Sequence, residues 1–230
     1  MNAQQLHDHI TKLEERVRRS SQKSQLGNSD ILVLAVSKTR AAEDIREAHA
    51  AGLSDFGENY LQEALGKIEA LSDLNLTWHF IGPLQSNKTR AVAENFDWVH
   101  TVDRAKIARR LSQQRPQGRA PLNICLQVNI SGEGTKSGVT LEALPALAEE
   151  VRDLPGITLR GLMAIPAPAE TEDEQRRPYR ALREAFVALR RSCPDIDTLS
   201  MGMSADLEAA IYEGATIVRI GTDLFGPRRR

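Results

Sequence analysis

Short apolar runs alternate with amphipathic stretches along the whole chain. The first stretch carries apolar residues at helical spacing, which predicts an N-terminal helix: Leu6, Ile10, Leu13 and Val17. After it we expect strands at Ile31–Lys38, Asp55–Asn59, Trp78–Gly82, Trp98–Val102, Asn123–Ile130, Leu159–Ile165, Thr198–Ser204 and Ile217–Phe225. Helical patterns lie between them near residues 42–51, 60–71, 87–95, 104–114, 141–154, 173–192 and 205–213. Gly52 and Gly214 are expected to end two helices, and Pro145 to lie in the first turn of another.

The strand runs are apolar at nearly every position, which is typical of parallel strands covered by helices. Eight such strands alternating with helices predict an α/β fold, a (β/α)8 TIM barrel with an extra N-terminal helix. An open doubly wound sheet is the alternative, and the count of eight strands disfavours it. Residues 166–178 have weak periodicity and predict a long loop. No linker rich in Pro, Gly or Ser divides the chain, so we expect one domain over residues 1–230.

Composition narrows the function classes. The 230 residues carry 30 basic and 31 acidic side chains, and this balance gives no support for binding nucleic acid. No apolar stretch approaches the roughly 20 residues that span a bilayer, and residues 1–25 do not resemble a secretory signal. Cys125 and Cys193 have no metal-type spacing and are expected to be reduced thiols. We therefore expect a cytoplasmic protein.

A lysine ends the first predicted strand. An ammonium group at the end of an apolar strand is costly unless a site uses it. In a parallel barrel, the carboxyl ends of the strands form the active-site mouth, so Lys38 is expected there. Desolvation favours a neutral amine, which can attack an aldehyde.

The last two strands predict an anion site. Ser204 is expected to cap the following helix, where backbone N–H groups are available. Gly221 would allow close approach to the backbone, and Thr222 would add a hydroxyl donor. Loops after strands seven and eight commonly bind phosphate in this fold. The alternative to an anion site is a purely structural role, in which Ser204 only caps its helix and Gly221 only turns the chain.

An arginine interrupts the last apolar strand. Arg219 cannot lose its charge, so it needs a ligand or a structural salt bridge, and both alternatives stay open. An amine for an aldehyde, a phosphate site and a cation for a heteroaromatic nitrogen together point to pyridoxal 5′-phosphate (PLP). Glu58 is either a general base near this site or, more simply, a salt-bridge partner.

Several segments resemble the pyridoxal phosphate homeostasis protein family, whose PLP-binding barrels are similar to the N-terminal domain of alanine racemases. The segments are Val36–Thr39, Phe56–Tyr60, Trp78–Lys88, Gly161–Met163, Gly202–Ser204 with Asp206 and Glu208, and Val218–Thr222. The resemblance implies that Lys38 carries PLP as a Schiff base and that Arg219 faces the pyridine nitrogen. It also implies a phosphate site at Ser204, Gly221 and Thr222, with Asn59, His79 and Met203 beside the ring.

The resemblance has consequences for activity. An arginine leaves the pyridine nitrogen unprotonated, which weakens the electron sink, and racemases of similar fold take a second base from a domain for which this chain has no room. We therefore expect PLP storage and buffering without robust catalysis, by a monomer whose partners could include PLP-dependent apoenzymes. The alternatives are a racemase-like PLP enzyme and an aldolase-like barrel in which Lys38 attacks a phosphorylated sugar. Lys136 and the C-terminal arginines have no assigned role.

Overall fold

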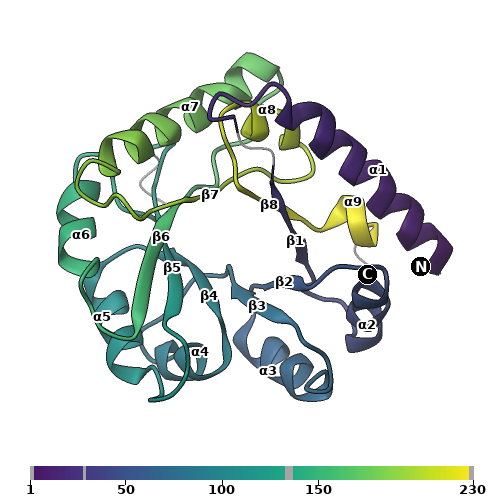
Figure 1. The fold of residues 1–230 in the computed structure, drawn as a ribbon, viewed down its shortest axis with the longest axis horizontal. Helices are drawn as coiled ribbons and strands as arrows, with labels where there is room; N and C mark the ends of the chain where they lie inside the picture. Colours follow the sequence, from purple (N-terminus) through teal and green to yellow (C-terminus); the bar gives the residue numbers. More distant parts are fainter. Residues whose placement is uncertain (1–2, 28–29, 133–136, 228–230) are drawn as a thin grey trace.

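The structure, a computed structural model, describes residues 3–27, 30–132 and 137–227. Lys136 and the three C-terminal arginines lie outside the described residues. Within them, eight parallel strands close into a barrel in the chain order β1 to β8, with β1 paired to β8. Helices surround this ring (Figure 1). The predicted (β/α)8 barrel is therefore confirmed, and the open sheet is wrong.

The strands are short and the helices alternate with them. The strands are β1 (Leu32–Val36), β2 (Asp55–Glu58), β3 (Thr77–Phe80), β4 (Trp98–Val102), β5 (Leu122–Gln127), β6 (Ile157–Met163), β7 (Thr198–Ser200) and β8 (Ile217–Ile220). The helices are α1 (Ala3–Ser21), α2 (Ala42–Ala50), α3 (Leu61–Ala70), α4 (Thr89–Asn95), α5 (Ala105–Gln114), α6 (Leu144–Val151), α7 (Glu172–Leu189), α8 (Leu207–Tyr212) and α9 (Thr222–Phe225).

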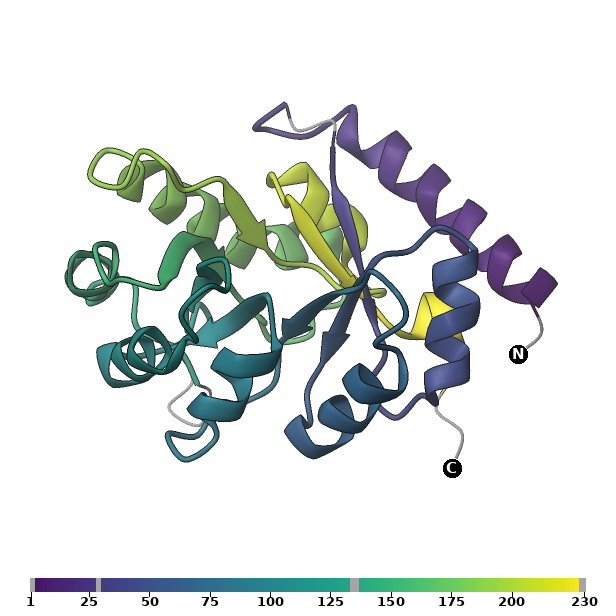
Figure 2. The ribbon, with the colours of Figure 1, turned by 60° about the horizontal axis from the view of Figure 1, so that its bottom comes forward.

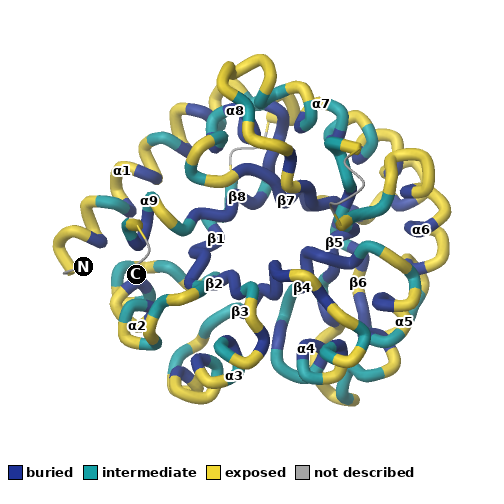
Figure 3. Tube along the Cα trace, turned by 180° about the vertical axis from the view of Figure 1, so that it is seen from behind, coloured by how far each residue is buried: buried dark blue, intermediate teal, exposed yellow. Residues whose placement is uncertain are grey.

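Side-chain alternation along the strands divides the apolar residues into two groups. The larger group lies between the strands and the surrounding helices and includes Phe56, Phe80 and Val218. The smaller group is Leu32, Leu34, Val36, Trp98 and Ile217, with Ile81 directly after β3. Their positions alternate with those of the outer group and therefore point into the barrel. Figure 3 shows the consequence: buried strands form a ring, and the helices expose their outer faces.

Helix α1 covers one side of the barrel beside α8 and α9 (Figure 2). The four apolar residues that predicted this helix are buried: Leu6, Ile10, Leu13 and Val17. Its Arg16 guanidinium pairs with Glu208 of α8 at 2.8 Å and with Asp223 of α9 at 2.5 Å. The N-terminal helix is thus fastened to the last two helices of the chain.

Two predicted elements are wrong. The strand expected at Ile217–Phe225 ends at Ile220, and Thr222–Phe225 form the short helix α9. The loop expected at residues 166–178 ends early because Thr171 and Glu174 form a capping box that starts α7 at Glu172. Pro178 lies inside this helix. Pro145 lies in the first turn of α6, as expected.

Several strands end before the polar residues that were expected to belong to them. β1 ends at Val36, β2 at Glu58 and β7 at Ser200, so Lys38, Asn59 and Ser204 all lie in the loops that follow. Gly82, after β3, packs directly on the loop after β2. A Cβ atom at Gly82 would lie 2.1 Å from the Asn59 carbonyl oxygen, so only glycine fits there.

We predict that Gly82→Ala lowers the free energy of unfolding by about 2 kcal/mol, because the loop at Asn59 must move to relieve the clash. Gly66→Ala is the matched control. Gly66 lies within α3 with open space around it, so the added methyl group should stabilise the protein by about 0.5–1 kcal/mol. Urea denaturation measures both variants. Equal effects of the two substitutions would contradict the close packing at Gly82.

Candidate functional site

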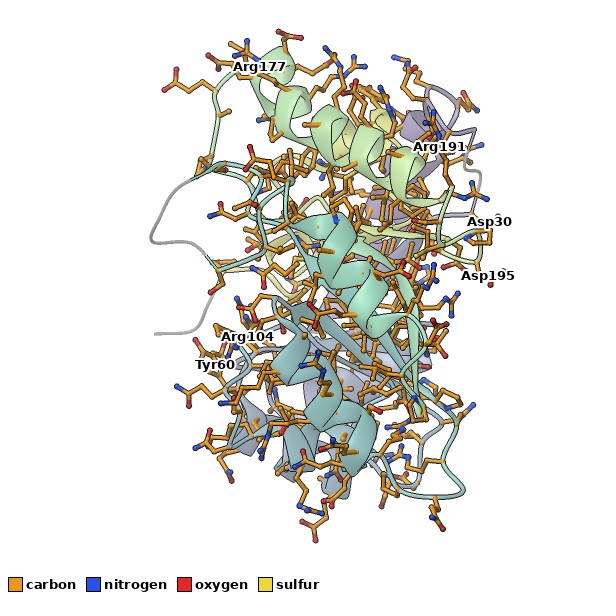
Figure 4. The ribbon with its side chains drawn as sticks, turned by 90° about the vertical axis from the view of Figure 1, so that its left-hand side faces the viewer. Asp30, Tyr60, Arg104, Arg177, Arg191 and Asp195 are labelled. Atoms are coloured by element: carbon orange, nitrogen blue, oxygen red, sulfur yellow. The ribbon has the colours of Figure 1, made fainter. Side chains whose placement is uncertain are left out.

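A cavity of about 320 Å³ opens at the carboxyl ends of the strands. Figure 4 shows this end of the barrel, marked by Tyr60, Arg104 and Arg177, opposite the end marked by Asp30, Arg191 and Asp195. The lining residues come from the ends of β1, β2, β3, β6, β7 and β8 and the loops after them: Val36, Lys38, Asn59, Ile81, Ile165, Met203, Ser204, Ala205, Arg219, Gly221 and Thr222. A larger cavity of about 580 Å³ lies at the opposite end, beside α1.

The structure brings seven of the eight expected site residues to the smaller cavity: Lys38, Asn59, Met203, Ser204, Arg219, Gly221 and Thr222. The eighth, His79, does not line it. His79 is fully buried within β3, and its ring contacts Asp55 at the first residue of β2, its neighbour His100, and Trp98. The ring therefore points toward the amino ends of the strands, away from the cavity.

Lys38 lies in a turn directly after β1. The ladder continues one residue past the strand, because the Ser37 N–H donates to the Gly57 carbonyl at 3.0 Å. The next residue, Thr39, has φ +64°, a conformation that is uncommon for a β-branched side chain. Its N–H donates to Glu63 Oε1 at 2.5 Å. Glu63 thus holds the strained turn that presents Lys38.

A buried ion cluster supports this turn from behind. Lys67 Nζ donates to the Ser37 carbonyl at 2.8 Å, to Glu58 Oε1 at 2.7 Å and to Glu63 Oε1 at 2.5 Å. Ser37 Oγ also donates to Glu58 Oε1, at 2.6 Å. Burial raises the pKa of the Glu58 carboxyl, although Lys67 and Ser37 oppose the shift. Glu58 is therefore a salt-bridge partner, the simpler of the two sequence-based alternatives.

Arg219 is a buried guanidinium held by neutral groups. Nη1 donates to the Ser200 carbonyl at 2.6 Å and to Ser200 Oγ at 2.9 Å, and Nη2 donates to the Ala164 carbonyl at 2.9 Å. No carboxylate in the described part of the chain forms an ion pair with it. Burial lowers the pKa of Arg219 below its ordinary value, and the group stays charged at neutral pH. The prediction that Arg219 forms a structural salt bridge is therefore wrong, and its positive charge faces the cavity.

Ser204 does not cap a helix. The residue before α8 is Asp206, and its carboxylate accepts hydrogen bonds from the Met203 N–H at 2.6 Å and from the Tyr179 hydroxyl at 2.7 Å. The prediction failed because the chain makes one more turn, over residues 204–206, before the helix begins. Ser204 Oγ instead accepts from the Asp223 N–H at 3.3 Å, which joins the loops after β7 and β8.

Arg16 fixes the same two loops from outside. Its Nη2 donates to the Ser204 carbonyl at 3.3 Å, while its ion pairs hold Glu208 and Asp223. Side-chain hydrogen bonding to these carboxylates raises the pKa of Arg16 and lowers that of Glu208. No sequence pattern pointed to Arg16, because its role depends on partners almost 200 residues away.

Two observations at the cavity fit a bound, polar, phosphate-bearing ligand such as PLP. Asn59 Oδ1 is buried, and no described residue donates a hydrogen bond to it. Gly221 has φ −113°, which any residue can adopt, and a Cβ atom there would meet only ordinary contacts with Val36, the nearest at 3.4 Å. The chain itself does not require glycine at this position, so glycine leaves room for a ligand. The amine, guanidinium and hydroxyl groups complete a donor set suited to PLP.

Other site types find no support. Among the residues described, no cluster of three His, Cys, Asp or Glu side chains could hold a metal ion. Within the same residues, no helix is both long and apolar enough to cross a membrane.

Comparison with known proteins agrees with this geometry. A family model described as alanine racemase, N-terminal domain, matches residues 9–229. A pyridoxal phosphate homeostasis protein of Pseudomonas aeruginosa is 60% identical over 221 residues, covering 96% of this chain and 95% of that protein. A pyridoxal phosphate homeostasis protein of Escherichia coli K12 is 51% identical over 230 residues, covering 99% of this chain and 95% of that protein.

Solved structures extend the comparison. PipY of Synechococcus elongatus with PLP bound superposes with a TM-score of 0.84 at 36% identity, covering 96% of this chain and all of that one. Alanine racemase of Corynebacterium glutamicum gives a TM-score of 0.68 at 16% identity, covering 94% of this chain and 61% of the racemase, and shows the fold alone. The chain therefore belongs to the class of barrels described as the alanine racemase N-terminal domain, and within that class to the family of pyridoxal phosphate homeostasis proteins.

The ion cluster behind Lys38 generates a stability prediction. Lys67→Met keeps the length of the side chain but leaves Glu58 buried without its cation, and it should lower the free energy of unfolding by about 3 kcal/mol at pH 7. Because burial already raises the Glu58 pKa, protonation should recover part of the loss as the pH falls toward 5. Denaturation at both pH values measures this, with Lys106→Met as an exposed control. A loss that does not depend on pH would contradict the assignment.

The buried histidines generate a pH prediction. Burial lowers the pKa of His79 and of His100 below the ordinary value of 6.5, so the unfolded chain binds more protons than the folded protein just below pH 6.5. Stability should therefore fall as the pH is lowered from 7.5 to 5.5. In His100→Gln this slope should be smaller by up to about 1.4 kcal/mol per pH unit. Denaturant midpoints across this range test it, and equal slopes would show that His100 does not contribute.

Proposed function

We propose that this protein binds PLP reversibly in the 320 Å³ cavity, through Lys38, and buffers the free concentration of the cofactor. The observation that carries the proposal is that Lys38 and Arg219, a buried cation without a carboxylate partner in the described chain, line the same cavity. The names of the homeostasis relatives and the PLP-bound state of PipY support the choice of cofactor.

Each lining group has a role in this proposal. Bound PLP supplies an aldehyde that reacts reversibly with an amine and a ring that withdraws electrons from bonds near that carbon. Lys38 provides the amine. Ser204, Gly221 and Thr222 would hold the phosphate, and Arg219 would donate to the ring nitrogen. Asn59 Oδ1 would accept from a ligand donor, and the exposed Met203 would cover the ring.

The same residues favour storage over catalysis. A guanidinium donates a hydrogen bond to a ring nitrogen but keeps its own proton, whereas a carboxylate partner would hold that nitrogen protonated. The ring then withdraws electrons weakly, so bonds to an amino acid's α-carbon are activated little. Relatives at 51–60% identity are named as homeostasis proteins, which fits this reading. Handover to PLP-dependent apoenzymes, a cytoplasmic location and a monomeric state stay predictions.

The first test is a visible absorbance spectrum of the protein after incubation with PLP. The wild type should show the yellow band of lysine-bound PLP. Borohydride reduction followed by peptide mapping should place the label on Lys38. Lys38→Ala should lose the band because no amine remains, whereas the exposed Lys106→Ala should keep it. A colourless wild type would overturn the proposal and favour an aldolase-like barrel that binds a sugar phosphate.

A second measurement separates storage from a racemase-like enzyme. The PLP-loaded protein is incubated with L-alanine in deuterated water, and exchange of the α-proton is followed by NMR. We expect exchange at least about a thousandfold slower than the median turnover of roughly 10 per second for enzymes, because the ring nitrogen is not protonated. Exchange at ordinary enzyme rates would establish the catalytic alternative instead.

A further inference from the structure

Five polar side chains form a continuous hydrogen-bonded chain across the inside of the barrel. Asp55 Oδ1 lies 3.0 Å from His79 Nε2, and His79 Nδ1 lies 3.0 Å from His100 Nε2. His100 Nδ1 lies 2.7 Å from Ser200 Oγ, which lies 2.9 Å from Arg219 Nη1. The chain thus connects β2, β3, β4, β7 and β8, and we call it the histidine relay.

The chemistry of the two ends sets the direction of every hydrogen bond. Arg219 has only donors, so Ser200 Oγ accepts from it and can donate its own proton to His100 Nδ1. A neutral His100 then carries its proton on Nε2 and donates to His79 Nδ1. His79 in turn carries its proton on Nε2 and donates to the carboxylate of Asp55. Neutral His79 and His100, both protonated on Nε2, therefore satisfy every hydrogen bond between the Arg219 guanidinium and the Asp55 carboxylate.

Reversing the relay would require an additional proton. If His100 donated from Nδ1 to Ser200, His79 would have to donate from Nδ1 and would face the Asp55 carboxylate with no proton on Nε2. An additional proton on either histidine or on Asp55 would remove that conflict. Complete burial of both rings opposes an imidazolium, and hydrogen bonds from His79 and Ser54 help to lower the pKa of Asp55. The ring of His79 also stacks on Trp98, with ring centroids 5.4 Å apart.

Several charged and titratable groups lie near the relay. The groups that act on its members are Asp55 and Asp97 on His79, His79 and Arg219 on His100, and Tyr179, Asp206 and Cys125 on Arg219. The positive charge of Arg219 opposes protonation of His100. Asp55 and Asp97 favour protonation of His79, but burial outweighs them and lowers the pKa of its ring. Neutral histidines therefore separate the two charged ends.

The relay connects the two cavities described above. Arg219 lines the 320 Å³ cavity, whereas Asp55 lines the 580 Å³ cavity at the amino ends of the strands. The Asp55 side chain is 17% exposed, so its carboxylate remains partly hydrated. The relay thus links the buried guanidinium to a carboxylate at the far end of the barrel, outside the cavity that Arg219 lines.

We propose that Asp55, His79, His100 and Ser200 are positioning residues for Arg219, which fix its Nη1 through Ser200 Oγ and so direct the guanidinium toward the ligand cavity. The relay gives the guanidinium a neutral acceptor, Ser200 Oγ, and no carboxylate of the described residues forms an ion pair with it. Its arrangement is a property of the ligand-free chain. Its effect on ligand binding rests on the proposed function, because the ligand that Arg219 would meet is the PLP ring.

The relay itself is tested without any ligand. Long-range ¹⁵N–¹H NMR of the wild-type protein labelled in histidine reports which ring nitrogen carries the proton. We expect both His79 and His100 as neutral Nε2–H tautomers from pH 6 to pH 8. In Ser200→Ala, His100 loses its donor at Nδ1 and should show a mixture of tautomers. An Nδ1–H tautomer of His100 in the wild type, or an imidazolium at neutral pH, would overturn the relay.

The effect on the ligand is tested with Ser200→Ala and a matched control. Ser112 is also buried and donates to a backbone carbonyl, Pro155 O, at 2.5 Å, far from the relay. Ser112→Ala should therefore cost stability without changing PLP binding. Ser200→Ala should bind PLP about 5- to 10-fold more weakly, the size of one hydrogen bond, but bind inorganic phosphate as the wild type does.

These measurements separate the two proposals. If folded Ser200→Ala binds PLP as tightly as the wild type, Ser200 does not position Arg219 and the inference is wrong. Equal weakening by Ser112→Ala would also overturn it, because the loss would then reflect stability alone. If the wild type fails to bind PLP, the proposed function fails, and the histidine tautomers alone decide whether the relay exists.

Discussion

The closed ladder of eight parallel strands is the constraint on which the rest of this structure depends. Closure removes every sheet edge and leaves an interior that side chains must fill. The closure is completed by bonds beyond the short strand β7: the Met201 N–H donates to the Ile217 carbonyl, and the Arg219 N–H donates to the Gly202 carbonyl, both at 3.0 Å. The same bonds carry the chain to the loop of Met203 and Ser204. The hydrogen bonds that close the barrel therefore also determine the geometry of the site.

Among the residues that the structure describes, Lys67 and Arg219 are buried cations held in different ways, and the difference matches their roles. Lys67 lies against two carboxylates, Glu58 and Glu63, which neutralise its charge locally. Its role is to support the turn that presents Lys38. Arg219 receives only neutral oxygens, from Ser200 and Ala164. A guanidinium that is satisfied as a donor but not neutralised nearby still attracts an electron-rich atom. This makes Arg219 suited to a ligand, whereas Lys67 is not.

Strand and helix periodicity sufficed to predict the barrel, because buried strands and amphipathic helices leave strong apolar patterns. Boundaries were less accurate. The strand expected to reach Lys38 ends at Val36, although its ladder continues through Ser37. The strand expected to reach Ser204 ends at Ser200, although apolar residues follow it. Parallel barrels bring strand ends together, which predicted that Lys38, Ser204 and Gly221 lie close to one another, and all three line the same cavity. His79 was misplaced because its ring meets Asp55 and His100, and no sequence pattern says toward which end of a strand an inward ring points. Arg16 escaped notice for a related reason, since its partner Asp223 is 207 residues away.

The ion pair between Arg16 of α1 and Asp223 of α9 has a consequence for how the protein folds during synthesis. A ribosome releases α1 and β1 first, but their partners α8, β8 and α9 come last, and Lys38 meets Arg219 only when β8 pairs with β1. Until then the apolar face of α1 has nothing to cover, and the interior of the barrel stays open. Contacts that join the two ends of a chain close slowly and late. The cavity therefore forms only after β8 has been synthesised and has paired with β1, so a nascent chain cannot bind a ligand there before that point.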